Sequence, residues 1–262
     1  MNYETIFFEV KEQAATITLN RPEAANGLNQ VMGRELMDAA IRCDEDQEIR
    51  AVLLTGKGRF FSAGGDLKYF SDSGEGMSTA LKEVTSYIDS AASKLTRMDK
   101  PLVVAINGAA AGIGMSFALY GDIILAAESA SFTAAYTAAA LSPDGGMTYL
   151  LPRCIGLLRA RELMLTNRRL SAKEALEWGL VSRVVPDAEL MSEAEKLVKA
   201  LAAGPTLSYS SVKRLMSSTF SQTLESQMEL EARGIASMSK TADAKEGVGA
   251  FLARRKPVFT GK

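Results

Sequence analysis

The chain alternates short apolar runs with longer segments in which apolar residues recur every three or four positions. The short runs are typical of buried strands, and the longer spacing is typical of helices that pack on one face. The predicted strands are residues 5–10, 15–19, 51–55, 102–106, 122–126 and 130–133. The predicted helices between them cover about 29–43, 79–98 and 113–120. Strands that alternate with helices favour an α/β architecture.

From about Gly156 the pattern becomes mostly helical. Ser171 and Glu174 have the spacing of a capping box, so a helix is expected to begin there. Four further helices are predicted at 187–202, 206–219, 222–239 and 241–254. By contrast, residues 70–78 are rich in Ser, Gly and Asp, and this composition predicts a mobile loop.

Two glycine-rich segments each follow a predicted strand: residues 59–68 (RFFSAGGDLK) and residues 107–115 (NGAAAGIGM). Small residues let another group approach the backbone closely, and two such turns could direct two N–H groups at one oxygen atom. That arrangement is an oxyanion hole, which stabilises an enolate or tetrahedral oxyanion. The alternative is that the glycines serve only the turns and their packing. Neither segment ends in the Gly-Lys-Ser/Thr of a phosphate-binding loop.

Composition narrows the possible partners. The 262 residues are 47% hydrophobic, enough for a sizeable core, and the formal net charge of −1 argues against nucleic acid or an anionic membrane as the main partner. Two cysteines, Cys43 and Cys154, show no paired spacing, which fits a reducing compartment. We see no leader-like start and no apolar run of the roughly 20 residues that span a bilayer, so we expect a cytoplasmic protein.

The sequence contains no histidine. This excludes Ser-His-Asp and Cys-His nucleophile systems and every histidine-ligated metal site. Acid–base chemistry near neutral pH must therefore come from a carboxylate, a lysine, a tyrosine or water. We expect no metal and no redox cofactor.

The two glycine segments, in this order and at this spacing, resemble the enoyl-CoA hydratase/isomerase (crotonase) superfamily. Further similar blocks extend over nearly the whole chain, at residues 19–22, 63–67, 106–108, 122–126, 150–156, 172–175 with 179–181, and 246–252. The resemblance implies a spiral of ββα units with an acyl-CoA site in residues 1–200. It also implies a helical region in residues 201–262 that trimerises, so a homotrimer or homohexamer is expected. Coenzyme A is then part of the substrate rather than a cofactor.

The same resemblance assigns residues to the site. It implies that the thioester oxygen binds between the backbone N–H groups of Gly65 and Ile113, the latter at a helix start whose dipole favours negative charge. It implies that the CoA moiety passes Ala24, Ala25, Ala63, Asp66, Leu67 and Lys68. Asp66 has an alternative role as the cap or brace of its own turn. In many relatives the C-terminal tail reaches a neighbouring subunit's CoA site, so ligand contacts from Phe259 and Lys262 are expected.

Positions at which this sequence differs from the family pattern indicate which reaction it catalyses. Family hydratases hold water between two glutamates, and Ser116 and Tyr136 occupy those positions here. Asp144 remains, in the segment 141–148 (LSPDGGMT). In several family isomerases an aspartate at this position is the acid–base residue, and in a family dehalogenase it is a nucleophile. On local grounds alone, Pro-Asp-Gly is a turn signal and Asp144 is a good N-cap for a following helix.

The leading hypothesis is an enoyl-CoA isomerase in which the oxyanion hole stabilises a dienolate and Asp144 moves a proton between two carbons. A fatty 3-enoyl to 2-enoyl shift and a phenylacetate-type ring isomerisation both fit. One alternative is a hydratase that uses Asp144 with unidentified partners. Another is an Asp-nucleophile hydrolase or dehalogenase, which is disfavoured because histidine is lacking and the single tryptophan, Trp178, lies in the later helical region. A third is an acyl-CoA-binding protein without turnover.

Overall fold

Ten strands form two sheets in residues 3–262, the part of the chain that the computed structural model describes. They are β1 (Ile6–Lys11), β2 (Ala14–Leu19), β3 (Ala51–Gly56), β4 (Phe60–Ser62), β5 (Leu102–Ile106), β6 (Ala109–Ala111), β7 (Ile123–Ala127), β8 (Ser131–Thr133), β9 (Leu170–Ser171) and β10 (Arg183–Val185). The larger sheet has the order β1-β2-β3-β5-β7-β10, and the smaller one β4-β6-β8-β9. Both are parallel except for the pairs β1–β2 and β8–β9.

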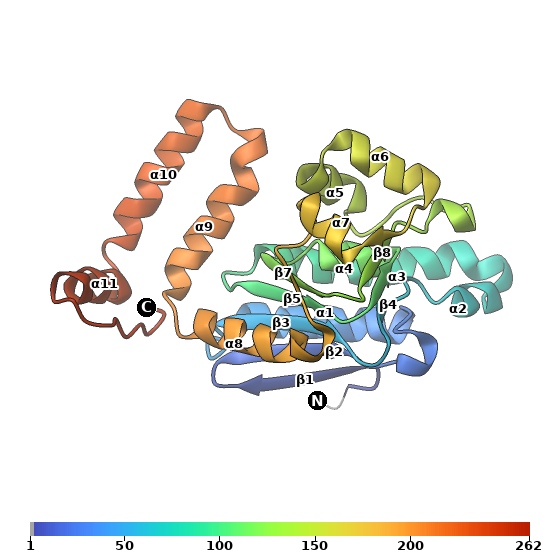
Figure 1. Cartoon of the computed structure of the whole chain (residues 1–262), viewed down its shortest axis with the longest axis horizontal. Helices are drawn as coiled ribbons and strands as arrows, with labels where there is room; N and C mark the ends of the chain where they lie inside the picture. The colour runs from blue at the N-terminus through green and yellow to red at the C-terminus, as the bar shows by residue number, and fades with distance from the viewer. Residues whose placement is uncertain (1–2) are drawn as a thin grey trace.

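Eleven α-helices complete the described chain (Figure 1). They are α1 (Gln30–Glu45), α2 (Leu67–Asp72), α3 (Met77–Arg97), α4 (Ile113–Ala118), α5 (Met147–Ile155), α6 (Leu157–Thr166), α7 (Ala172–Glu177), α8 (Leu190–Ala202), α9 (Thr206–Ser218), α10 (Leu224–Met238) and α11 (Ala242–Leu252). Within residues 3–262 no helix has both the length and the apolar character required to cross a membrane.

The chain repeats one unit three times. A strand of the large sheet (β3, β5, β7) is followed by a strand of the small sheet (β4, β6, β8) and then by a helical segment. Successive repeats pair in parallel in both sheets, so the chain advances as a spiral of ββα units. The predicted fold class is confirmed. Because equivalent strands of each repeat end at the same edge, the turns after β4 and β6 are neighbours.

The core lies between the large sheet and its covering helices. β3 and β5 are almost entirely buried, as expected of central parallel strands covered on both faces, and their sequences are correspondingly apolar. α1 and α3 pack against each other, and α8 packs on β3, β5 and β7. The helices present one apolar stripe to this core, as with Leu36 of α1 and Ile88 of α3, which are both 2% exposed.

The prediction of a mobile loop at residues 70–78 is wrong. These residues form the end of α2, a 3-10 turn at Gly74–Gly76 and the start of α3. Asp66 caps α2 by accepting from the Tyr69 N–H at 3.1 Å, and Phe70 is buried in the core. One cap and one buried aromatic side chain therefore outweigh a composition that is typical of loops.

The C-terminal part is mostly helical, as predicted, and also contains the short strands β9 and β10. The predicted capping box of Ser171 and Glu174 is present. α9 and α10 form a hairpin that stands away from the core (Figure 1). The chain then returns, and Asp243 of α11 accepts from the N–H groups of Thr260 at 2.7 Å and Gly261 at 2.8 Å. The tail is thus anchored on its own chain. The expected contact of Phe259 and Lys262 with a neighbour's ligand concerns an assembly and stays a prediction.

Candidate active site

The two glycine segments lie against each other. Gly64 has a positive φ of +105°, and a Cβ there would come within 3.0 Å of the Ala111 carbonyl oxygen. Gly112, also with positive φ, lies directly across from Gly64 and leads into α4. A β-carbon on Gly114 would meet the Ser62 carbonyl oxygen at 2.5 Å. Glycine is therefore required for this close approach of β4 and α4.

The approach brings two free backbone N–H groups to one cavity. Gly65 and Ile113 both line it. Ile113 is the first residue of α4, where a helix leaves its N–H without an internal partner. In the hydrogen bonding of residues 3–262, neither the Gly65 N–H nor the Ile113 N–H has an acceptor. Two unpaired donors beside one cavity have the character of an oxyanion hole.

The cavity has a volume of about 240 Å³ and walls that are mostly apolar. Its far wall includes Phe70 of α2 and Val84 and Ile88 of α3. Among the described residues that line it, Asp144 carries the only charged side chain. The cavity thus combines two hydrogen-bond donors with a single carboxylate in apolar surroundings.

Asp144 sits partly buried on the turn before α5, and its Oδ1 accepts from the Tyr136 hydroxyl at 2.7 Å. Burial raises the pKa of the Asp144 carboxyl above its ordinary value. The hydrogen bond from Tyr136 lowers the same pKa, and the negative charge of Asp89 on α3 raises it. An elevated pKa suits a group that must both take up and release a proton.

The local alternative for Asp144, an N-cap of α5, is wrong. The N-cap of that helix is Gly146, in a left-handed conformation with φ +75°, and it makes no side-chain cap bond. Only the backbone oxygen of Asp144 contributes, by accepting from the Met147 N–H at 3.1 Å. The turn signal of Pro143-Asp144-Gly145 was correct, but the carboxylate points to Tyr136 rather than to the helix.

The two positions that carry glutamates in family hydratases do meet in space. Ser116 is fully buried on α4, and its Oγ lies 3.2 Å from the Tyr136 hydroxyl oxygen. Burial, followed by the negative charge of Asp144, raises the pKa of Tyr136 far above its ordinary value. Its hydroxyl therefore stays protonated and acts as a donor. Neither residue supplies a second acid.

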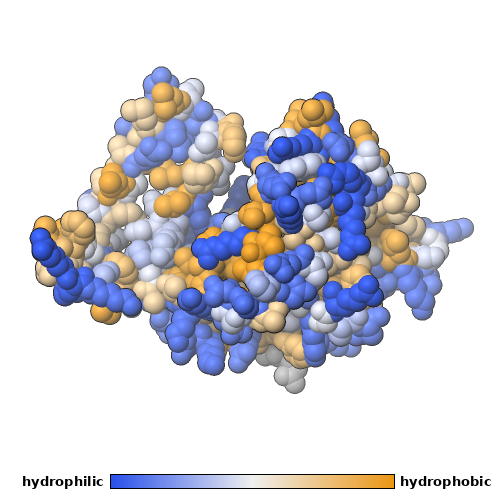
Figure 2. Space-filling view, viewed as in Figure 1, coloured by the Kyte–Doolittle hydropathy of each residue, from blue (hydrophilic) through white to orange (hydrophobic). Residues whose placement is uncertain are grey.

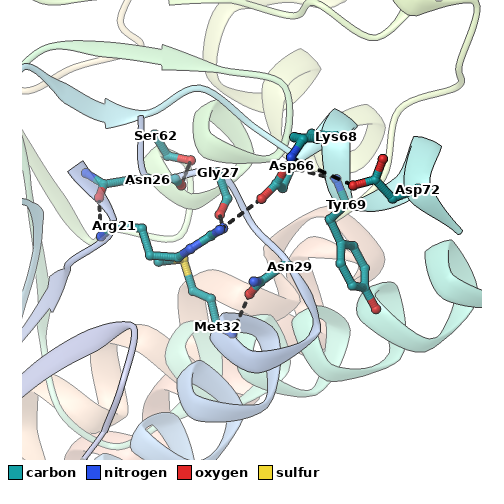
Figure 3. Close-up of polar contacts among 10 residues, drawn as sticks. All are labelled: Arg21, Asn26, Gly27, Asn29, Met32, Ser62, Asp66, Lys68, Tyr69 and Asp72. Atoms are coloured by element: carbon teal, nitrogen blue, oxygen red, sulfur yellow. Dashed lines mark hydrogen bonds and ion pairs between the residues drawn. The ribbon is translucent and has the colours of Figure 1, made fainter. Parts of the chain in front are cut away.

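Two of the six predicted CoA-binding residues line this cavity. They are Ala63 and Leu67, and the Ala63 N–H donates to the carbonyl of Ala25 at 2.9 Å. Ala24 lies in the 3-10 turn Pro22–Ala24, directly before Ala25. Lys68 is exposed, 4.0 Å from Asp72, and a pair so exposed leaves the ammonium available to a ligand (Figure 3).

Asp66 acts as a brace. Besides capping α2, its Oδ2 pairs with the Arg21 guanidinium at 3.0 Å, and the same guanidinium donates to the Gly27 carbonyl (Figure 3). Arg21 thereby ties the strand-following turn to the first glycine segment. The sequence reasoning assigned it no role. The only signal for it was its place in a polar block, Asn20-Arg21-Pro22, directly after a strand.

The sequence pattern likewise assigned no structural role to Asn26. It is fully buried in a left-handed conformation with φ +53°. Its side-chain amide donates to three carbonyl oxygens, those of Lys57, Phe60 and Phe61. A buried amide satisfied in this way fixes the backbone that leads into β4. The dipeptide Asn26-Gly27 was its signal, since both residue types accept positive φ.

Comparison with known proteins agrees with this geometry. The family profile described as enoyl-CoA hydratase/isomerase matches residues 9–262. The chain is 40% identical to the 1,2-epoxyphenylacetyl-CoA isomerase of Escherichia coli K12 over 99% of both chains. It is 39% identical to a probable enoyl-CoA hydratase of Rhodobacter capsulatus over the full length of both. A crystal structure of a putative enoyl-CoA hydratase/isomerase from Mycobacterium abscessus has a TM-score of 0.95 at 34% identity, covering 98% of this chain and all of that one.

A spiral of ββα units with two free N–H groups at adjoining glycine turns defines a crotonase-fold protein. The chain belongs to the enoyl-CoA hydratase/isomerase family. It is thus an enzyme of the enoyl-CoA hydratase/isomerase family, and an acyl-CoA thioester substrate is consistent with that family.

Proposed function

We propose that this protein is an enoyl-CoA isomerase that shifts a double bond by a proton shuttle on Asp144. The observation that carries the proposal is the single carboxylate in the cavity described above. A shift of a double bond needs one group that takes a proton from one carbon and returns it to another. Hydration must in addition hold and activate a water molecule.

In the proposed reaction the thioester oxygen accepts from the N–H groups of Gly65 and Ile113. This lowers the pKa of the C2 protons because the charge of the dienolate falls on that oxygen. Asp144 takes a C2 proton, and the C–H electrons form the dienolate with the C3–C4 double bond. The protonated carboxyl then gives the proton to C4. The electrons return to re-form the thioester carbonyl and leave a C2–C3 double bond, so no water or electron is consumed.

The CoA moiety is proposed to run past Ala24, Ala25, Ala63, Asp66, Leu67 and Lys68. In this group Lys68 is the residue suited to bind a phosphate, and Asp66 acts by holding the turn. The acyl group enters the apolar cavity. A cavity of about 150 Å³ is enough to bind benzene, and this one has about 240 Å³. A short alkenyl chain and a six-membered ring both fit, and the 40% identity to an isomerase named for a ring substrate favours including rings.

A hydratase that uses Asp144 is the second candidate, because relatives of both kinds resemble this chain. Against it stands the neutral pair Ser116 and Tyr136, which supplies no second carboxylate to bind water.

The test is proton NMR of 3-hexenoyl-CoA and crotonyl-CoA, each incubated with the enzyme in deuterium oxide. We expect 3-hexenoyl-CoA to convert to the 2-enoyl isomer much faster than crotonyl-CoA gains water. Faster hydration would refute the isomerase assignment and favour the hydratase. Tight binding of both compounds without conversion or deuterium exchange would indicate a binding protein.

A further inference from the structure

Three hydroxyl groups hold the turn that carries Asp144. Tyr136 donates to the Asp144 carboxylate at 2.7 Å, Ser116 donates to the Asp144 carbonyl at 3.2 Å, and Tyr120 donates to the Gly145 carbonyl at 2.8 Å. All three residues are at least nine-tenths buried. Ser116 lies on α4, the helix that begins with the free N–H of Ile113, and Tyr120 follows two residues after the end of that helix. One helix thus fixes the backbone of the base and one donor of the oxyanion hole.

The hydroxyl protons can be assigned from the acceptors. The Asp144 carbonyl can only accept, and the Tyr136 proton points to the carboxylate Oδ1. The Ser116 hydroxyl therefore donates toward the Asp144 carbonyl oxygen and the Tyr136 hydroxyl oxygen, each of which lies 3.2 Å from the Ser116 Oγ. A hydrogen bond to a charged acceptor is about twice as strong as a neutral one. Tyr136 is thus bound most tightly when Asp144 is ionised.

We propose that Tyr136 is a positioning residue for the proton shuttle: its hydroxyl holds Oδ1 of Asp144, so that Oδ2 alone exchanges protons with the substrate, and Ser116 orients that hydroxyl. The inference rests on the proposed function of Asp144. A hydrogen bond to one oxygen disfavours rotation of the carboxylate, and both carbons of the substrate must then reach the same atom. The position that holds a glutamate in family hydratases thus acts here on the base rather than on water.

The charged and titratable groups around Asp144 allow the role of Tyr136 to be measured through the pKa of the Asp144 carboxyl. Tyr136 lies at the start of the 3-10 turn Thr137–Ala139, Tyr120 lies just after α4, and Asp89 lies on α3. In the described part of the chain, Tyr136 is the only side chain that hydrogen-bonds to the Asp144 carboxylate, and no cation forms an ion pair with it. Removing the hydroxyl takes away a side-chain hydrogen bond that lowers the pKa of that carboxylate, while burial and the charge of Asp89, which both raise the pKa, remain.

The experiment is Tyr136→Phe, which removes the hydroxyl and keeps the ring. We expect kcat on 3-hexenoyl-CoA to fall about 10- to 100-fold, within the range of a general-base contribution, with KM changed less than about threefold. The acidic limb of the kcat/KM profile should move to higher pH. Ser116→Ala should give a smaller shift in the same direction, because Ser116 acts through Tyr136.

The matched control is Tyr3→Phe. The Tyr3 hydroxyl donates to Asp38 Oδ2 at 2.6 Å, which is the same kind of pair at a position outside the cavity. Its removal should lower stability without moving the pH profile. A Tyr136→Phe enzyme whose pH profile superimposes on that of the unmodified protein, or whose loss lies entirely in KM, overturns the proposal.

Failure of the proposed function gives a different result. If Asp144→Asn retains turnover, Asp144 is not the base, whatever Tyr136 does. Titration of the Asp144 carboxyl by carbon-13 NMR then tests the hydrogen bond between Tyr136 and Asp144 without an activity measurement. A higher pKa in Tyr136→Phe supports the hold on Oδ1, and an unchanged pKa refutes it. If Asp144 is the base, adding Tyr136→Phe to Asp144→Asn should change the residual rate less than about twofold, since residues that act as a unit are not additive.

Discussion

At the scale of single residues, the carboxyl of Asp144 determines the chemistry that this cavity supports. Among residues 3–262 it is the one acid that lines an apolar cavity with two free N–H groups. Burial raises its pKa, and a tyrosine hydroxyl rather than a cation stabilises its ionised form. The site therefore retains a carboxylate at some cost in stability, as functional sites commonly do.

The substitution Asp144→Asn should separate the effect of the carboxyl on catalysis from its effect on stability. Turnover should fall about 10²- to 10⁴-fold, the usual contribution of a general base, while binding of acyl-CoA changes only a few fold. Since the folded-state pKa of Asp144 is raised, its stabilising contribution is complete below the unfolded-state pKa and is lost as pH rises through the folded-state pKa. At pH 7 the Asn variant should therefore melt at a higher temperature than the unmodified protein.

Calorimetry across pH provides the check. The gain in melting temperature should shrink as pH falls toward about 4, the ordinary pKa of an aspartate, because the Asp144 carboxyl then becomes protonated and is uncharged like the asparagine. A gain that does not depend on pH would show that ionisation is not its cause. Near-wild-type turnover by this variant would remove Asp144 from the catalytic role.

At the scale of elements, the position of the two free N–H groups depends on the contact between β4 and α4. Gly114 has no room for a β-carbon, because the Ser62 carbonyl oxygen lies 2.5 Å from where it would be. The Cβ and Oγ atoms of Ser62 lie almost as close, at 2.7 and 2.8 Å, and the backbone oxygen cannot move aside as the end of a flexible side chain can. The two segments can therefore keep their spacing only with glycine at this position.

Gly114→Ala should push α4 away from β4 and so separate the N–H groups of Gly65 and Ile113. We expect a loss of stability of about 1–3 kcal/mol, typical of overpacking, and a fall in kcat larger than the change in KM. Gly76→Ala is the control, because nothing lies within 4 Å of a β-carbon there, and its effect should stay within about 0.5 kcal/mol. Urea unfolding and steady-state kinetics measure both. Full activity in Gly114→Ala would contradict the requirement for close contact.

At the scale of the whole molecule, the C-terminal hairpin is the least enclosed part of the fold. A wide cleft of about 910 Å³ separates α9 from α3 and α5. Large apolar side chains are exposed along α9, α10 and α11, and Figure 2 shows them on the protruding hairpin. They include Met216, Phe220, Leu224, Ile235, Phe251 and Leu252, each at least 66% exposed. So much apolar surface in one region is typical of an interface.

We therefore predict that the protein assembles through residues 201–262 into a homotrimer or homohexamer. Light scattering at micromolar concentration should give the mass of three or six chains. Ile235→Glu on α10 should shift the equilibrium toward smaller species, because it places a charge in a buried contact. Leu165→Glu on α6, also at an exposed leucine but outside this region, is the control. A stable monomer of the unmodified protein would contradict the prediction.

Much of the fold and part of the site could be predicted from the sequence. Residues 102–106 match β5, and the two glycine segments mark the turns that carry the free N–H groups. Hydrophobic period and turn chemistry act over a few neighbouring residues, which is why a single sequence determines them. The same local rules gave wrong predictions for residues 70–78 and for Asp144 as an N-cap. At both places, contacts with residues distant in the sequence determine the structure.

Only the tertiary structure decided how the candidate base is held. Ser116, Tyr136 and Asp144 are separated by 20 and 8 positions, and their spacing predicts no contact. They meet because successive ββα units stack in parallel and carry α4 and the turn after β8 to the same side of the cavity. The sequence by itself determined the elements, the family likeness and the missing glutamates. The stacking of those elements determined which oxygen of Asp144 is held and by what, because hydrogen bonds between distant segments form only once the sheets bring them together.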